Sequence, residues 1–363
     1  MPIKKIGVLT GGGDCPGLNA VIRAIVKPAI YCYGIEIVGI LDGYKGLVEG
    51  LVTPLTEASV SGIIARGGTI LGTSNRSDPF EYEVPDKKGD SVTRDRSQDV
   101  LRQIKSLELD GLIVIGGDGT LSIAQRLFEM EVPVVGIPKT IDNDLEATDI
   151  TFGFNSALNI ATDAVDRLHT TAESHHRVMI LEVMGRYAGW IALRAGLAGG
   201  GDVILIPEIR YDFQKVCDAI RKRADLGKRF SIVVVAEGAR SVEGQMVVQK
   251  IVKGSPDPLR LGGIGQVIAQ QLENKTELES RVVILGHLQR GGIPTPFDRW
   301  LATRFGVAAL ELLISRYFGR MVCLRGEKIE SVELKEAVSR PHRVDPQGEE
   351  VHVAKSVGTS FGD

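Results

Sequence analysis

The sequence predicts an α/β fold in which mainly parallel sheets are flanked by helices. Short apolar, β-branched runs recur along the chain, and each ends in glycine, proline or a carboxylate. Segments of helical length separate these runs, and such alternation is typical of parallel sheets. Glycine is abundant as well, with 43 in 363 residues, and it lies at the ends of the apolar runs. We therefore expect tight turns with close backbone approach at many strand ends.

The expected elements follow in a regular order. Strands are expected at residues 3–9, 35–40, 177–183, 203–206, 232–236 and 282–285, with two more in the runs LIVIG and PVVGIP between residues 112 and 144. Helices are expected to end near residue 33, to cover residues 121–130, 155–169, 211–224, 262–273 and 299–315, and to begin at residue 187. Residues 67–80 are rich in turn formers, the charged residues 83–99 indicate a solvated loop, and the last twenty residues indicate weak order.

Composition excludes several classes of protein. The formal net charge of −3 gives no electrostatic case for binding nucleic acid or membrane surfaces. The first residues, MPIKKIGVLT, lack a signal-peptide pattern, and no apolar run is long enough to span a bilayer. The four cysteines are far apart and form no CxxC pair, so neither a zinc site nor a disulfide framework is indicated. A cytoplasmic location is the expectation.

Polar side chains follow the two central apolar runs directly. The motif GGDGT contains Asp118 and Thr120, and the motif KTIDND contains Thr140, Asp142 and Asp144. Because open α/β sheets bind ligands at the carboxyl ends of their strands, we expect these five side chains to lie close together. Asp118 could hold magnesium or cap the following helix, and DND could be an acidic turn. In an extended segment, alternate residues point to the same side, so Asp142 and Asp144 would lie together. That pairing suits a general base beside a carboxylate that organises magnesium.

Counter-charges and glycine turns complete a phosphate-binding set. TGGGDCPG lies between a strand and a helix, where it could bind phosphate or form a tight turn, and it matches neither GxGxxG nor the P-loop. Four arginines, one histidine and one glutamate lie at or near strand ends: Arg177, Arg186, Arg281, Arg290, His287 and Glu237. Guanidinium groups bind phosphate bidentately. Together these features indicate phosphoryl transfer to a phosphorylated acceptor.

The sequence closely resembles the phosphofructokinase family, the enzymes that phosphorylate fructose 6-phosphate at its 1-hydroxyl. The resemblance covers roughly residues 3–319 and rests on IGVLTGGGDCPGLNA, GGTILGTS, VIGGDGT, GIPKTIDNDL, SHHRVMILEVMGRYAG, VVAEGA and RVVILGHLQRGGIPTPFDR. It implies two similar α/β domains with the active site in the cleft between them. Residues 1–153 with about 289–339 would bind nucleotide, 154–288 would bind the sugar phosphate, and 340–363 would be a C-terminal extension.

The resemblance also assigns roles to individual residues. Asp142 would be the catalytic base, with Thr140, Asp144 and Arg186 beside it. The nucleotide would contact Gly12, Arg76, Gly117, Asp118, Gly119 and Thr120, with Asp118 on Mg²⁺. The sugar phosphate would contact Thr140, Asp142, Met184, Gly185, Arg186, Glu237, His287 and Arg290, with Arg177 and Arg281 supplied by a neighbouring subunit. A homo-oligomer, dimer or tetramer, is therefore expected.

The phosphoryl donor depends on two positions. Family members that use pyrophosphate resemble one another in having Asp at the position of Gly119 and Lys at that of Lys139, whereas regulated bacterial ATP users have Gly at both. This chain is mixed. A side chain at residue 119 would fill the space of the nucleotide's α-phosphate and add a repelling charge, so Gly119 favours ATP as donor, and glycolytic ATP-dependent phosphorylation of fructose 6-phosphate is the predicted activity. Pyrophosphate is the alternative donor.

Two other functions are alternatives to this prediction. A sugar-phosphate or nucleotide-binding regulator on the same fold would require a broken catalytic set, and Asp118, Asp142 and Arg186 are all present. A nicotinamide-dependent oxidoreductase would require GxGxxG, which is missing. Regulatory control is a further question, because the chain resembles the bacterial enzymes at Arg23 of their regulatory site but has Lys27 where they have a second arginine.

Overall fold

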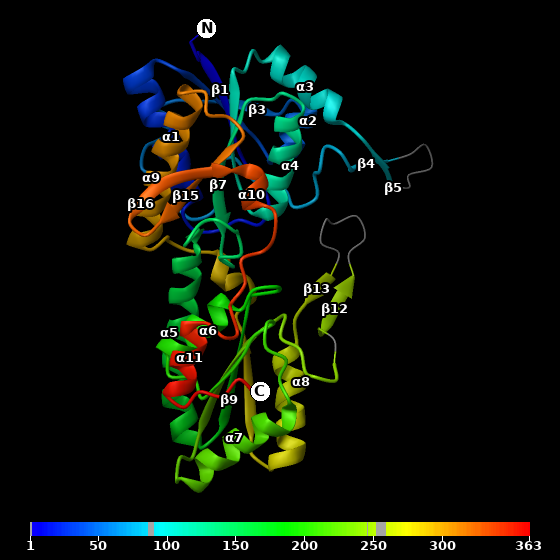
Figure 1. Cartoon of the computed structure of the whole chain (residues 1–363), viewed down its shortest axis with the longest axis vertical. Coiled ribbons are helices and arrows are strands. Elements are labelled where there is room, and N and C mark those ends of the chain that lie inside the picture. Colours follow the sequence, from blue (N-terminus) through cyan, green and yellow to red (C-terminus); the bar gives the residue numbers. More distant parts are fainter. Residues whose placement is uncertain (1, 86–90, 245, 252–258) are drawn as a thin grey trace.

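The computed structural model describes residues 2–85, 91–244, 246–251 and 259–363. It contains two sheets of mainly parallel strands, each flanked by helices, with one sheet beyond the other along the long axis of the molecule (Figure 1). The predicted α/β class is confirmed. Within the described ranges, every helix is too short or too polar to cross a bilayer.

The larger sheet has the strand order β16-β15-β7-β6-β1-β2-β3, and β8 pairs with β7. Its strands are β1 (Lys5–Thr10), β2 (Glu36–Ile40), β3 (Val52–Leu55), β6 (Gly111–Gly116), β7 (Val134–Thr140), β8 (Phe152–Gly153), β15 (Arg320–Arg325) and β16 (Lys328–Glu333). The central strands β2, β1, β6, β7 and β15 are parallel to one another, and β3 and β16 run antiparallel at the two edges. The carboxyl ends of β1, β6 and β7 therefore meet at one edge of the sheet.

Both faces of this sheet are buried, which explains its continuous apolar runs. Successive residues of a strand point to opposite faces, so Ile113 joins one hydrophobic core and Val114 the other. Helices α1 (Leu18–Tyr33) and α9 (Pro296–Ile314) pack together over the first face. Helices α2 (Tyr44–Glu49), α3 (Ser97–Ser106), α4 (Asp118–Glu129) and α10 (Leu334–Ala337) lie on the other side in Figure 1. A short 3-10 turn, η1 (Ala58–Val60), packs on α1.

The smaller sheet is parallel throughout, with the order β10-β11-β9-β14. Its strands are β9 (Val178–Val183), β10 (Val203–Leu205), β11 (Ser231–Ala236) and β14 (Ser280–Ile284). The long helix α5 (Phe154–His175) leads from the larger sheet to the smaller one and packs with α6 (Trp190–Ala198). Helices α7 (Phe213–Asp225) and α8 (Ile264–Thr276) pack together, and η2 (Gly286–Arg290) follows β14 beside α5.

Two local predictions differ from the structure, and one small ribbon was not predicted. Residues 83–99 are not one loop, because β4 (Tyr82–Pro85) and β5 (Ser91–Arg94) pair as an antiparallel ribbon, while 86–90 lie outside the described residues. A second small ribbon, β12 (Val248–Ile251) with β13 (Leu259–Leu261), was not expected. Weak order at the C-terminus was wrong. Helix α11 (Glu349–Ser356) forms there, Phe361 is 1 % exposed, and Ser360 bridges to Val203 beside the edge strand of the smaller sheet.

Candidate active site

A glycine loop follows β1 and is held from two sides. Gly11 donates its N–H to the carbonyl oxygen of Ile115 at 2.9 Å, and Gly12 donates to that of Ser74 at 3.2 Å. Gly12 has φ 76°, in the left-handed region that favours glycine. A methyl group on Gly11 would lie 2.6 Å from the Thr120 side chain. The sequence uses glycine here because the loop lies against the start of α4 with no room for side chains.

The start of α4 is accessible beside this loop. Asp118 and Gly119 are exposed, whereas Thr120 is 7 % exposed and its carbonyl oxygen accepts a hydrogen bond from the Tyr44 hydroxyl at 2.9 Å. Asp118 Oδ1 accepts the Gly119 N–H at 2.7 Å. A Cβ built on Gly119 meets no atom within 4 Å. The positive dipole of the helix amino terminus therefore faces open space, the arrangement that binds phosphate in many α/β proteins.

The two carboxylates that follow β7 are half-buried in an acidic position. Asp142 donates its backbone N–H to Thr140 Oγ1 at 3.1 Å, and its Oδ1 is buried with no hydrogen-bond partner among the described residues. Burial raises the pKa of Asp142 to about 6; Arg290 and Arg186 act in the opposite sense, and Glu237 raises it further. Burial also raises the pKa of Asp144, and the charges of Asp142 and Asp118 add to that effect. The two loops thus form one electrostatic site.

Arginines reach this site from the smaller sheet. Arg290, at the end of η2, donates from Nη1 to the carbonyl oxygen of Asp14 at 3.1 Å, and a methyl group on Gly13 would lie 2.7 Å from the same nitrogen. Arg186 follows β9, and its charge opposes the rise that burial causes in the pKa of Glu237. Cationic groups from one sheet therefore lie opposite carboxylates and glycines from the other.

The turn after β9 has a backbone that only glycine accepts easily. Gly185 has φ 135°, and a Cβ there would lie 2.8 Å from the carbonyl oxygen of Ala188. Gly238 donates its N–H to Gly185 O at 3.1 Å, and Glu237 donates to Val183 O at 2.9 Å. The Met184–Arg186 turn and Glu237 are therefore neighbours at the carboxyl ends of β9 and β11.

Lys139 occupies a position that the sequence did not reveal. Its side chain points into the interior, where Nζ donates to the carbonyl oxygen of Gly13, and the residue is 3 % exposed. Burial lowers the pKa of its ammonium, and the charges of Cys15, Asp14 and Asp144 oppose that effect. Lys139 thus connects the end of β7 to the glycine loop after β1.

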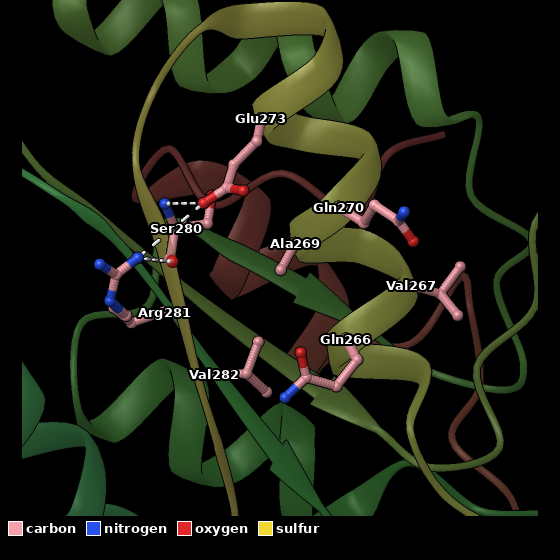
Figure 2. Close-up of a pocket in the computed structure, with 8 residues that line it drawn as sticks. All are labelled: Gln266, Val267, Ala269, Gln270, Glu273, Ser280, Arg281 and Val282. Carbon is pink, nitrogen blue, oxygen red and sulfur yellow. Dashed lines mark hydrogen bonds and ion pairs between the residues drawn. The ribbon is translucent and has the colours of Figure 1, made fainter.

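Arg177 and Arg281 lie at the opposite end of their strands from the candidate site of their own chain. They are at the amino ends of β9 and β14, whereas Arg186 and Glu237 follow the carboxyl ends of β9 and β11. Arg177 Nε pairs with Glu279 Oε2 at 2.7 Å, and Arg281 pairs with the other oxygen of the same carboxylate. Figure 2 shows Arg281 beside an open groove between β14 and α8, near Glu273.

The remaining predicted residues are less constrained. Arg76 is exposed, and its backbone N–H donates to Ser74 Oγ at 3.3 Å; His287 is exposed in η2. Gly117 precedes α4 with extended backbone and lies beside the carbonyl oxygen of Lys139. Among the described residues, no group of three or more His, Cys, Asp or Glu side chains could hold a metal by itself. An ion bound mainly by substrate oxygens, with one carboxylate from the protein, fits this donor set.

The fold and the site together define an α/β protein that binds phosphorylated ligands at the carboxyl ends of parallel strands. A phosphofructokinase family model matches residues 5–313, and the chain belongs to the phosphofructokinase family. It is 54 % identical to ATP-dependent 6-phosphofructokinase 2 of Clostridium perfringens over all of this chain and 99 % of that one.

Two further relatives are named as pyrophosphate-dependent enzymes. The chain is 50 % identical to the pyrophosphate–fructose 6-phosphate 1-phosphotransferase of Streptomyces coelicolor, over 99 % of this chain and all of that one. The solved structure of a pyrophosphate-dependent phosphofructokinase from Nitrosospira multiformis superimposes with a TM-score of 0.81 at 21 % identity, covering 96 % of this chain and 88 % of that one, which shows the shared fold. Relatives named ATP-dependent 6-phosphofructokinase are also found in Chloroflexus aurantiacus and Synechocystis sp., at 51 % and 48 % identity over 99 % of this chain and 98 % and 99 % of those chains, so the names support ATP more than pyrophosphate.

Proposed function

We propose that the protein transfers the terminal phosphoryl group of ATP to the 1-hydroxyl of fructose 6-phosphate, giving ADP and fructose 1,6-bisphosphate in glycolysis. The observation that carries this is Asp142 Oδ1, which is buried without a hydrogen-bond partner among the described residues, in a site where the charges of Arg186 and Arg290 oppose those of Glu237 and Asp118. In the proposed step the sugar oxygen attacks the terminal phosphorus, the bond to the leaving ADP oxygen breaks, and Asp142 takes the hydroxyl proton. Arg186 stabilises the charge on the transferring group.

ATP is the proposed donor because of the space at Gly119. The exposed amino end of α4 leaves a volume that a pyrophosphate user of this family would fill with an aspartate, and here no atom lies within 4 Å of a Cβ built at that position. The nucleotide phosphates would lie between Gly12, Gly117, Gly119 and Thr120, with Arg76 as a further contact. Pyrophosphate is the second candidate, because the Streptomyces relative carries that donor in its name.

A magnesium ion is proposed at Asp118. Magnesium in phosphoryl transfer is held by one or two carboxylates together with substrate phosphates and water. Asp118 is exposed at the mouth of the glycine loop, and it raises the pKa of Asp144, so it contributes negative charge to the same site. The ion would neutralise charge on the donor phosphates while Asp118 fixes its place.

The sugar phosphate is proposed to lie against the smaller sheet. Met184, Gly185, Arg186, Glu237, His287 and Arg290 would contact it, with Thr140 and Asp144 beside the reacting hydroxyl. The domain division is proposed as the resemblance implies it: residues 1–153 with about 289–339 hold the donor and 154–288 the acceptor, with Thr140, Asp144 and Arg290 reaching the acceptor from the donor side. In support, β15 and β16 pair within the larger sheet although they follow the smaller one in the chain.

A homo-oligomer is proposed, a dimer at least and a tetramer by family resemblance. Arg177 and Arg281 are paired with Glu279 at the far end of their strands, so they suit a site on a neighbouring subunit better than their own. Strand β14 is an edge strand, and Ile284 on it is 48 % exposed. Exposed apolar edges of this kind are usually covered by a partner.

A cytoplasmic location is also proposed. All four cysteines are free thiols, three of them buried, which fits a reducing compartment. The activity is tested by incubating the protein with fructose 6-phosphate, ATP and Mg²⁺ and following ³¹P NMR. Formation of the bisphosphate and ADP in equal amounts is expected. Release of inorganic phosphate without a sugar bisphosphate would contradict the proposal.

A further inference from the structure

The loop that carries Asp142 and Asp144 contains a residue in a strained backbone conformation. Asn143, between the two carboxylates, has φ 52°, in the left-handed region, which asparagine tolerates better than most residues but which still carries a free-energy penalty. Its side chain is 1 % exposed: Oδ1 accepts the Thr151 N–H at 2.9 Å, and Nδ2 donates to the Asp149 carbonyl oxygen at 3.3 Å. These bonds hold the loop from the inside.

The same loop is held from the outside by the C-terminal strap, defined as residues 340–363. His342 donates its backbone N–H to the carbonyl oxygen of Asp144 at 2.9 Å. Its ring Nδ1 lies 3.0 Å from the carbonyl oxygen of Asn143, and because a carbonyl only accepts, Nδ1 carries the proton. Pro341 bridges to Leu145 in the antiparallel sense. One residue of the strap thus satisfies two consecutive carbonyl groups of the carboxylate loop.

His342 also contacts α6, which packs on the smaller sheet. Its ring stacks on Trp190 with centroids 4.8 Å apart and planes at 29°, and Trp190 Nε1 donates to the His342 carbonyl oxygen at 3.1 Å. Trp190 begins α6, four residues after Arg186. Glu208 Oε1 accepts the N–H groups of both Gly189 and Val344, at 3.0 and 2.9 Å. The strap therefore binds the turn that follows Arg186 as well as the carboxylate loop.

Beyond His342 the strap is fixed along its length. Arg194 pairs bidentately with Glu350, at 3.0 and 2.7 Å. The end of the chain adds to the edge of the smaller sheet, where Ile204 donates to Ser360 O at 2.9 Å and Phe361 is buried. Helix α11 packs on α6, beside which it lies in Figure 1. The segment that follows His342 is thus well packed, and it holds His342 in place.

We propose that His342 is a positioning residue for the phosphoryl-transfer reaction. Its Nδ1–H fixes the Asn143 peptide and so the direction of the flanking carboxylates, and its stacking on Trp190 keeps that loop in register with the turn bearing Arg186. This inference rests on the function proposed above. Because reacting groups must be held within a fraction of an ångström, a loosened loop lowers the rate more than it weakens substrate binding.

Three substitutions separate the hydrogen bond from the stacking. His342→Ala loses both, His342→Phe keeps an aromatic ring on Trp190 without the donor, and His342→Asn keeps an amide N–H near the position of Nδ1 without the ring. We expect kcat to fall about 10-fold to 100-fold in the Ala and Phe variants, with the KM values for both substrates changed less than about 3-fold. The Asn variant should recover at least about 5-fold in kcat over Ala.

The control variant is Glu350→Gln, which breaks the Arg194 pair in the same strap at a distance from the loop. It should lower the thermal midpoint and leave kcat unchanged. All assays run well below the lowest midpoint, so that the Asn and Ala variants, which both lose stacking, differ only in the donor.

Equal kcat in the Asn and Ala variants, or a wild-type kcat in the Phe variant, would overturn the positioning role. Wild-type protein without turnover on ATP and fructose 6-phosphate would instead overturn the proposed function, so the two failures are distinguishable.

Discussion

Lys139 and Gly13 are joined by a hydrogen bond from the ammonium to the carbonyl oxygen, across the space between the ends of β7 and β1. The ammonium that could have contacted a pyrophosphate donor therefore holds the glycine loop. The two positions that the sequence linked to donor choice, Gly119 and Lys139, therefore have different surroundings. Gly119 faces open space, whereas Lys139 is enclosed, and the predictions below follow from that contrast.

Gly119→Asp should abolish use of ATP without unfolding the protein. The new carboxylate fills open space at the start of α4, where it repels nucleotide phosphates. An acidic residue in the first turn of a helix stabilises it by about 0.3–1 kcal/mol, so Tm should stay within a few degrees of wild type. We expect kcat/KM for ATP to fall at least about 100-fold. Gly119→Ala, which adds only a methyl group, is the control and should keep most ATP activity; equal losses in the two variants would contradict the role of charge.

Lys139→Met should act on binding more than on chemistry. Removing the ammonium frees the Gly13 carbonyl and loosens the loop that cradles the donor, so the KM for ATP should rise about 10-fold while kcat falls less. Steady-state kinetics at saturating fructose 6-phosphate measure the split. A large fall in kcat with an unchanged KM would mean instead that Lys139 contacts the transferring group.

Asp142→Asn should lower the activity and raise the stability of the folded protein. Loss of a general base lowers kcat by about 10²–10⁴. The wild-type carboxylate has a raised pKa, so it destabilises the folded state above about pH 6 and this penalty disappears as pH falls toward the unfolded-state pKa. The variant should therefore be more stable than wild type by about 1–3 kcal/mol at pH 8 and equal to it near pH 4. Urea unfolding at both pH values measures this; a constant difference would contradict the assigned pKa.

The pH dependence of wild-type turnover follows from the same group. The base acts only when deprotonated, so kcat/KM for fructose 6-phosphate should fall about 10-fold per pH unit below a pKa near 6, the value to which burial raises Asp142. An inflection near the ordinary carboxylate pKa, close to 4, would show that the base is a solvated group. The residual activity of Asp142→Asn, measured over the same range, is the control and should lack this inflection.

Mixed oligomers test whether Arg281 serves a neighbouring subunit. Asp142→Asn and Arg281→Ala should each be nearly inactive alone. Coexpressed in equal amounts, they form hybrid dimers in which one of the two sites has both wild-type residues, so about a quarter of the sites should recover. No recovery in purified hybrids would mean that Arg281 acts within its own chain.

The parts of the fold that the sequence predicted best are those buried on both faces. β1, β6 and β7 appear as unbroken apolar runs because helices cover both sides of the sheet. The β15–β16 ribbon was missed because β16 is an edge strand whose outward residues are polar. The strap was missed because its order depends on partners far away in the sequence, such as Trp190 and Asp144.

The site shows the same limit. Asp118, Asp142 and Asp144 could be grouped because parallel strands end at one edge, and the structure brings their charges together. Strand position alone did not say which end of β9 or β14 carries an arginine toward the carboxylates. The Lys139–Gly13 and His342–Asn143 bonds depend on side-chain direction and long-range packing, which no local pattern contains.

The most direct test of the account is a steady-state assay with fructose 6-phosphate and Mg²⁺ in which ATP and pyrophosphate are supplied separately. The account predicts turnover with ATP and a kcat/KM for ATP at least about 100-fold above that for pyrophosphate. Turnover with pyrophosphate alone, or with neither donor, would contradict it.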